Sequence, residues 1–215
     1  MIKVISFDVD GTLVLPDFND LIWFEVLPRL YAEKRSLNIK KAKDEVFKEY
    51  NRIGADDCRW YSLDFWLDYF GLDSDQNSLL NKYADKVTLY PDVLPSLGKL
   101  SLRYDLVVGS GMPDNSIEIK MRKDNIKRFF KRMFSSISEF GLVKKDESFY
   151  ARVCQDLGIE PHQLAHIGDH YQVDYLAALQ AGALAFHLDR KQEREKHLGS
   201  IYDLNDLEKE LETRR

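Results

Sequence analysis

The 215-residue sequence contains little cysteine, proline or glycine, and it has no long apolar run. Its two cysteines, Cys58 and Cys154, lie far apart and form no CxxC pair, so neither a disulfide framework nor a zinc site is indicated. With 11 glycines and 6 prolines, a collagen-like or low-complexity chain is excluded. The longest stretch without a charged residue, 175–188, is shorter than the roughly 18 apolar residues that a membrane helix needs. We therefore expect no membrane partner.

Charged residues are plentiful, and acidic ones are in slight excess. The 31 Lys and Arg against 36 Asp and Glu give a formal net charge of −5, which disfavours nucleic acid as a partner. One basic stretch, residues 120–132, is interpreted as a solvated helix face, because it lies between predicted strands of an acidic chain. The first residues lack the basic start, apolar run and cleavage site of a secretory signal, so we expect a cytoplasmic protein.

Hydrophobic periodicity divides the chain into a helical part and an alternating part. Residues 2–9 predict a buried strand that leads into a polar turn, Asp10-Gly11-Thr12. Apolar residues at three- and four-residue spacing then predict four helices in a row, over residues 17–35, 39–53, 56–70 and 75–87. From Pro91 onward the pattern alternates, with helices predicted over 93–102, 114–125, 147–157 and 174–181 and strands over 104–109, 133–136, 163–167 and 183–188.

Strands that alternate with helices form a parallel sheet with crossover helices. The predicted fold class is therefore α/β, a doubly wound, Rossmann-like parallel sheet with an inserted α-helical cap. We expect a core domain of residues 1–15 and 90–215 and a cap domain of residues 16–89. The many aromatic residues of the cap are interpreted as packing residues because they recur at helical spacing.

Acidic side chains follow two of the predicted strands. Asp8 and Asp10 lie at the end of the first strand, and Asp169, with Asp174 five residues later, follows the strand over 163–167. In an open parallel sheet the ligand binds at the carboxyl ends of the strands, so these groups should converge. Clustered carboxylates raise one another's pKa unless a cation lies among them, and oxygen ligands without His or Cys favour Mg²⁺.

The acidic residues are part of a larger pattern of motifs. Four motifs follow one another along the chain: Asp8-x-Asp10-Gly11-Thr12, Ser110 after an apolar strand, Lys144 in Gly141-Leu142-Val143-Lys144, and Gly168-Asp169-x₄-Asp174. In the order and spacing of these motifs, and over nearly its whole length, the sequence resembles the haloacid dehalogenase-like (HAD) hydrolase superfamily, in the phosphatase branch with a C1-type helical cap.

The resemblance implies an enzyme that hydrolyses a small phosphorylated metabolite through an aspartyl-phosphate. Asp8 would be the nucleophile, and Asp10 would protonate the leaving alcohol and then activate water. Ser110 and the backbone amide of Gly111 would bind phosphoryl oxygens, and Lys144 would offset the charge of phosphate and nucleophile. The expected partner is a small phosphate ester. The sequence leaves the oligomeric state, monomer or homodimer, open.

The resemblance also implies a Mg²⁺ cofactor. A carboxylate oxygen of Asp8, the backbone carbonyl of Asp10 and the side chain of Asp169 would hold the ion. Asp174 would lie behind these ligands and orient a bound water or the motif lysine.

Three positions depart from the usual motifs of the superfamily. Gly111 stands where many relatives have Asn, Lys145 where Pro often follows the motif lysine, and His170 and Val173 replace a usual Ser and Asn. Lys145 leaves open which lysine points inward, although the spacing of the motif favours Lys144. His170 is interpreted as a bystander.

Other activities stay open beside the phosphatase. A 2-haloacid dehalogenase is disfavoured by Asp10, because dehalogenases of this superfamily lack an acid at this position. A phosphonatase would need a cap lysine that forms an imine, and the cap lysines stand in a polar, crowded context. A catalytically idle protein that binds a phosphorylated ligand would have no need of Asp10.

Overall fold

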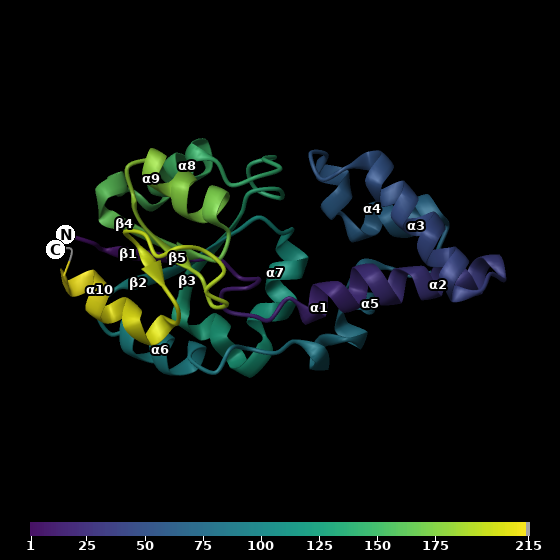
Figure 1. The fold of residues 1–215 in the computed structure, drawn as a ribbon, viewed down its shortest axis with the longest axis horizontal. Coiled ribbons are helices and arrows are strands. Elements are labelled where there is room, and N and C mark those ends of the chain that lie inside the picture. Colours follow the sequence, from purple (N-terminus) through teal and green to yellow (C-terminus); the bar gives the residue numbers. More distant parts are fainter. Residues whose placement is uncertain (214–215) are drawn as a thin grey trace. The chain divides into compact units, whose positions relative to one another are not determined.

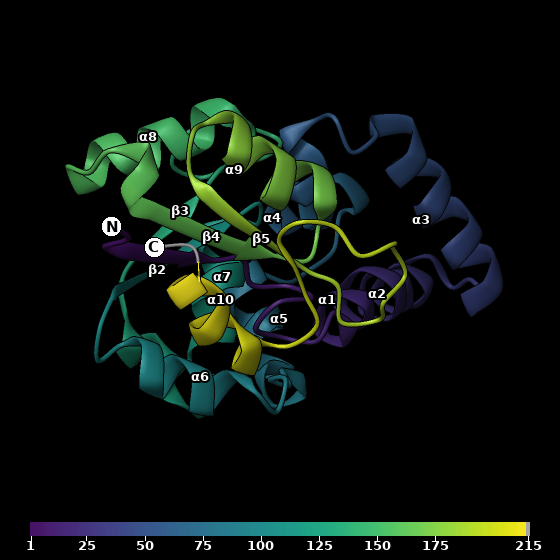
Figure 2. The ribbon, with the colours of Figure 1, turned by 60° about the vertical axis from the view of Figure 1, so that its left-hand side comes forward.

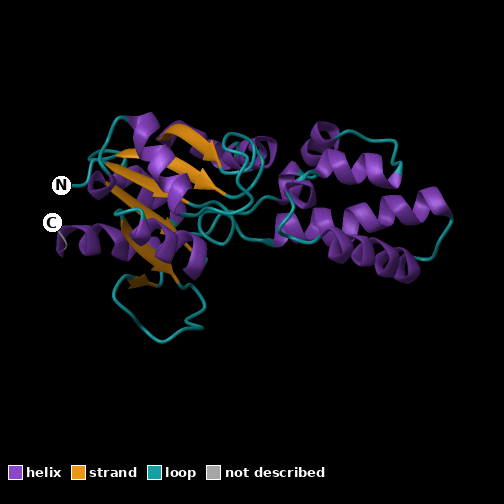
Figure 3. Cartoon of the chain, turned by 90° about the horizontal axis from the view of Figure 1, so that it is seen from above, coloured by secondary structure: helices purple, strands orange, loops and turns teal. Residues whose placement is uncertain are grey.

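The computed structural model describes residues 1–213, which form two compact units (Figure 1). The core unit consists of Met1–Leu15 and the chain from Leu89 onward, and the insert unit consists of Pro16–Thr88. Strands occur in the core unit, whereas the insert unit is helical (Figure 3). In the described part of the chain, no helix combines the length and the apolar character needed to cross a membrane.

The core unit contains a six-stranded sheet in which every pairing is parallel, with the order β3-β2-β1-β4-β5-β6. From β1 the chain builds outward to β3 on one side, then returns and builds outward to β6 on the other. This arrangement confirms the predicted doubly wound α/β fold. The strands are β1 (Val4–Phe7), β2 (Asp105–Ser110), β3 (Phe130–Ser135), β4 (Leu164–Gly168), β5 (Leu184–Leu188) and β6 (Ser200–Ile201).

Helices cover both faces of this sheet. Helices α8 and α9 lie on one face and α6 and α10 on the other, as Figures 1 and 2 both show. The α-helices of the core unit are α6 (Val93–Leu100), α7 (Asp114–Met121), α8 (Glu147–Leu157), α9 (Ala177–Gln180) and α10 (Leu207–Thr213), and a π-helical stretch (Tyr171–Leu176) leads into α9.

Helix α8 occupies the residues that its periodicity predicts. Asp146 caps its first turn by accepting a hydrogen bond from the Phe149 amide at 3.1 Å, and Gly158 ends it in the left-handed conformation with φ of 64°. Phe149 and Val153 share its inner face and are buried against the sheet. The apolar surface that they remove from water holds α8 over the strands.

Helix α7 ends earlier than its sequence predicts. The chain leaves the helix after Met121, and Asp124 and Asn125 adopt left-handed conformations with φ of 47° and 53°. Asn and Asp tolerate this region better than most residues, because their short side chains bond to the local backbone. Strand β3 consequently begins at Phe130 rather than Met133.

The insert unit is built around aromatic side chains. Trp66 is fully buried; it stacks on Phe70 with ring centroids 5.5 Å apart and meets Tyr50 edge to face at 4.7 Å. Trp23 and Trp60 stack at 5.9 Å. The α- and π-helices of this unit are α1 (Asp17–Asp20), a π-helical stretch (Leu21–Val26), α2 (Leu27–Arg35), α3 (Ile39–Ile53), α4 (Leu63–Phe70) and α5 (Gln76–Lys82), and short 3₁₀ helices span Cys58–Tyr61 and Ala84–Lys86.

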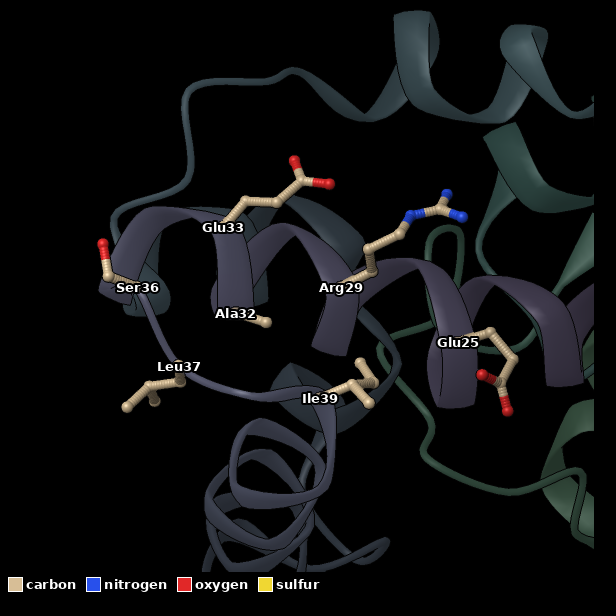
Figure 4. A pocket seen from close by; sticks show the side chains of 7 residues that line it. All are labelled: Glu25, Arg29, Ala32, Glu33, Ser36, Leu37 and Ile39. Atoms are coloured by element: carbon tan, nitrogen blue, oxygen red, sulfur yellow. The ribbon is translucent and has the colours of Figure 1, made fainter.

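A pocket lies beside α2 in the insert unit (Figure 4). None of the motif residues lines it. Of its acidic side chains, Glu25 is paired with Lys43 at 2.5 Å. The pocket is lined by Glu25, Arg29, Ala32, Glu33, Ser36, Leu37 and Ile39.

The two ends of the insert are tied together within the core unit. Val14 and Leu89 form an antiparallel bridge, and the Tyr90 amide donates to the Leu13 carbonyl at 3.1 Å. The chain therefore leaves and re-enters the core unit at neighbouring points.

Arg190, which follows β5, contacts both segments that connect the insert to the core unit. Its guanidinium donates to the Asp92 carboxylate at 2.9 Å and to the Thr12 carbonyl at 2.7 Å, and it lies 3.8 Å from the ring centroid of Tyr90. Asp92 also accepts a hydrogen bond from the Leu204 amide at 2.7 Å. Segments from both ends of the sequence thus meet at one ion pair, in which Asp92 is buried and Arg190 is half-buried.

Candidate active site

Asp8 stands directly after β1, the strand at which the order of the sheet reverses. Its backbone amide donates to the Ile167 carbonyl at 2.8 Å, so neighbouring β4 fixes its position. The side chain is buried. Crevices at such a reversal, beyond the carboxyl ends of the strands, are where open α/β sheets bind ligands.

The turn after Asp8 requires glycine. Gly11 has φ of +74°, and a Cβ atom built on it would lie 2.1 Å from the Asp169 carboxylate. Any side chain here would displace Asp169 from the end of β4. A second glycine, Gly168, is equally constrained, since its Cβ would lie 2.2 Å from Cγ of Asp174.

These contacts bring together three of the predicted carboxylates. One oxygen each of Asp8, Asp169 and Asp174 lies within 4.8 Å of the others. Asp8 and Asp174 are buried, whereas Asp169 reaches solvent. The set contains only oxygen donors, which suits a hard divalent cation such as Mg²⁺.

The lysine that joins this cluster is Lys145, which corrects the predicted placement of Lys144. The Lys145 ammonium forms ion pairs with Asp8 and Asp174 and donates to the Gly109 carbonyl at 3.2 Å, with only 4% of its side chain exposed. Lys144 lies on the exposed surface. The reason is local: the chain before α8 is irregular, so the spacing from Gly141 does not fix which side chain points inward.

Burial and charge shift the pKa values of this cluster in different directions. Burial, with Asp174 and Asp169 nearby, raises the pKa of Asp8 despite Lys145. Burial also opposes charge on Asp174 and Lys145, but their mutual attraction outweighs it, so the pKa of Asp174 falls and that of Lys145 rises. Although Asp169 reaches solvent, partial desolvation and the charge of Asp174 raise its pKa to about 7.

One ammonium and three carboxylates leave an excess of negative charge when all are ionised. The raised pKa values of Asp8 and Asp169 express this excess, because protonation is one way to relieve it. A divalent cation held by these oxygens would relieve it as well, so the residues present fit Mg²⁺.

Ser110 ends β2 beside β1. It is buried, and its hydroxyl oxygen accepts a hydrogen bond from the Met112 amide at 3.1 Å, which leaves its own proton available for donation. The hydroxyl of Ser135 holds the same loop by donating to the Met112 carbonyl at 2.7 Å. The loop that contains Gly111 is thereby fixed at the carboxyl end of the sheet.

Asp10 lies beyond Asp8 on the turn, with 20% of its side chain exposed. Both of its carboxylate oxygens are 2.7 Å from the ammonium of Lys120. Lys120 is fully buried, so the interpretation of residues 120–132 as a solvated face does not hold at its first residue.

A model of the haloacid dehalogenase-like hydrolase family matches residues 2–182. The chain belongs to this family. The match spans both units, and it confirms the resemblance seen in the sequence and the expectation of a hydrolase.

Relatives of this HAD hydrolase include proteins whose names refer to phosphate esters. The glyceraldehyde 3-phosphate phosphatase of Methanopyrus kandleri is 26% identical over 223 residues, which cover 97% of this chain and 93% of that protein. The GMP/IMP nucleotidase YrfG of Escherichia coli is 22% identical over 170 residues, which cover 78% of this chain and 74% of that protein.

Solved structures share the fold of this HAD hydrolase. A HAD phosphatase from Thermococcus onnurineus superposes with a TM-score of 0.84 at 24% identity, over 98% of each chain. A 2-haloacid dehalogenase from Pseudomonas syringae pv. Tomato DC3000 superposes with a TM-score of 0.71 at 20% identity, over 100% of each chain. The fold therefore accommodates both chemistries, and the residues of the site must decide between them.

Beside the motif residues, the HAD hydrolase site contains a buried histidine that belongs to none of the four motifs. His166 lies between the Ser6 hydroxyl at 3.0 Å and the Asp174 carboxylate at 3.1 Å, and burial lowers its pKa. His170 is exposed and contacts Asp174 through its backbone amide, at 2.9 Å. The sequence does contain one signal for His166: it is a polar residue in the middle of an otherwise apolar, buried strand.

Proposed function

We propose that this HAD hydrolase is a Mg²⁺-dependent phosphatase that acts on a small phosphorylated metabolite through an aspartyl-phosphate on Asp8. The observation that carries the proposal is Asp10, a second carboxylate two residues after Asp8 on the same turn. A carbon-centred displacement of halide needs no acid there, whereas an alkoxide leaving from phosphorus needs a proton. The names of these two relatives, a nucleotidase and a phosphatase, support the same reaction class.

The chain's own groups account for both halves of the reaction. A carboxylate oxygen of Asp8 attacks phosphorus, the ester P–O bond breaks, and Asp10 gives its proton to the departing oxygen. Asp10 then takes a proton from water, whose oxygen attacks phosphorus and breaks the acyl–phosphate bond, which regenerates Asp8. Lys145 favours the ionised form of Asp8 against the effect of burial, and it offsets the charge of the phosphoryl group.

Asp8, the Asp10 carbonyl and Asp169 are the proposed Mg²⁺ ligands. Asp174 is proposed to hold Lys145 in place behind them. When bound, the ion supplies positive charge next to the phosphoryl oxygens. Ser110 and the Gly111 amide are proposed to bind those oxygens from the β2 side.

The test is release of inorganic phosphate from a panel of nucleotides, sugar phosphates and triose phosphates, together with p-nitrophenyl phosphate. We expect release in Mg²⁺ and its loss in excess EDTA. We expect Asp8→Asn to abolish turnover, a loss of at least about 10⁴-fold, with an unchanged circular dichroism spectrum. Turnover that survives in the folded variant would contradict the nucleophile.

The other reaction classes have their own signatures, each of which is read in a separate assay. Halide release from 2-haloacids would indicate a dehalogenase, and borohydride trapping of a lysine imine would indicate a phosphonatase. Tight binding of a phosphate ester in Mg²⁺ without any turnover would indicate a binding protein. Size-exclusion chromatography separates the proposed monomer from the proposed homodimer.

A further inference from the structure

We infer that Lys120 is a positioning residue that sets the carboxylate of Asp10 in the orientation required for proton transfer. The inference rests on the proposed function, since it concerns the group that handles protons there. It starts from a contact between α7 and the turn after β1, in which one ammonium lies 2.7 Å from each oxygen of one carboxylate.

Lys120 occupies a position that an apolar residue would fill. Counted from Ile117, Lys120 and Met121 stand at the i+3 and i+4 positions of one face of α7, and all three residues are buried. Burying an ammonium costs free energy even when it is paired, and a well-packed apolar residue often serves stability equally well. The charge of Lys120 on this otherwise apolar face is better explained by its contact with the Asp10 carboxylate than by packing.

The contact fixes an otherwise movable group. The backbone of the turn is held by the bridge between Asp10 and Val14 and by the hydrogen bond from the Gly11 amide to the Val14 carbonyl at 2.8 Å. Those bonds leave the rotation of the Asp10 side chain free. Contact with both carboxylate oxygens removes that freedom, and proton transfer depends steeply on orientation.

The same segment of chain also places Ser110. Ser110 is the last residue of β2, and α7 begins four residues later. A single stretch of chain from β2 into α7 therefore supplies both the proposed phosphate-binding hydroxyl and Lys120. The distance between the phosphoryl group and the proton donor is thereby set by one rigid strand-to-helix unit together with β1.

The test compares two esters that differ in how much they need an acid. Phenyl phosphate releases phenolate, which is more basic than the p-nitrophenolate released from p-nitrophenyl phosphate, so the second ester depends less on proton donation. We expect Lys120→Met to lower kcat on phenyl phosphate roughly 10- to 100-fold, with KM little changed and a much smaller loss on p-nitrophenyl phosphate. The matched control is Lys127→Met, which removes an ammonium from an exposed ion pair with Glu118 and should leave both rates unchanged.

A double variant separates positioning from a structural role. In an Asp10→Asn background, Lys120→Met should cause no further loss of kcat, because the group that it positions is already absent. Equal losses on the two esters, or losses that add in the double variant, would overturn the inference. If Lys120→Met does not fold, the same comparison with Lys120→Gln decides the question, since its amide fills a similar volume without the charge.

Assays of the wild-type protein distinguish a failure of the proposed function from a failure of the role assigned to Lys120. Absence of metal-dependent phosphate release from both esters by the wild type overturns the proposed function itself. Release by the wild type, with the same ratio of rates in the folded Lys120 variant, overturns only the role of Lys120.

Discussion

Lys144 and Lys145 are neighbours in the chain, yet they stand in opposite environments. Lys145 is enclosed by Asp8 and Asp174, whereas Lys144 is exposed. A strand or helix fixes side-chain direction by its period, but the segment before α8 has no period. For this reason the carboxylates at the strand ends could be placed from sequence and the lysine could not.

The two lysines provide a matched pair of variants. We expect Lys145→Met to lower kcat for phosphate release by about 100- to 1,000-fold, because the charge next to the nucleophile and the phosphoryl group is lost. Lys144→Met should retain the wild-type rate. The measurement is steady-state phosphate release in saturating Mg²⁺, with circular dichroism to show that both variants fold. The reverse order of effects would assign the role to Lys144.

Cys154 and Cys58 differ in the same way and can be distinguished by chemistry. Burial raises the pKa of the Cys154 thiol to about 11, so only ~0.1% of it is thiolate at pH 8. Cys58 is half-buried. We expect a disulfide reagent at pH 8 to modify Cys58 first and Cys154 only after addition of denaturant. Mass spectrometry of the labelled peptides checks this, with Cys58→Ser as the control that should remain unlabelled in the native state.

At the scale of elements, prediction succeeds where periodicity and caps agree. Helices α3 and α8 have the predicted bounds because Asn38 and Asp146 cap them and Gly54 and Gly158 end them. Helix α7 is shorter than predicted, because Asp124 and Asn125 adopt left-handed conformations. The hydrophobic periodicity of the sequence does not reveal this interruption. The burial of Lys120 on that helix was equally hidden, since a lysine in a basic stretch is usually solvated.

Arg190 joins the segments that contain Thr12 and Asp92, and this contact has a measurable consequence for stability. Arg190→Ala would leave the Asp92 carboxylate buried without its cationic partner, and we expect the free energy of unfolding to fall by about 3 kcal/mol. Lys191→Ala, one residue along and exposed, should change it by less than about 0.5 kcal/mol. Urea unfolding followed by fluorescence measures both. Equal stability of the two variants would show that the ion pair contributes nothing net.

At the scale of the whole molecule, the helical insert interrupts a complete α/β unit. All the candidate site residues lie in the core unit, and the insert begins and ends beside the bridge between Val14 and Leu89. The predicted core and cap domains are therefore proposed to be separable, although they share one chain.

We expect the core unit to fold without the insert. Replacing residues 16–88 by a short Gly-Ser linker joins two ends that already lie side by side, so the sheet should form and unfold cooperatively. Far-ultraviolet circular dichroism and a thermal unfolding curve check this. A product without a cooperative transition would show that the core unit depends on the insert.

The central position of β1 in the sheet also determines whether the N-terminal segment stays bound after proteolysis of the insert. A protease that cleaves within the insert would leave Asp8 on a short peptide, separate from most of the sheet. That peptide is paired with β2 on one side and β4 on the other, and the Lys3 amide donates to the Gln163 carbonyl at 2.9 Å. The nicked protein should therefore migrate as one species under native conditions and as two in denaturant, with the nucleophile kept in place by its neighbours rather than by continuity of the chain.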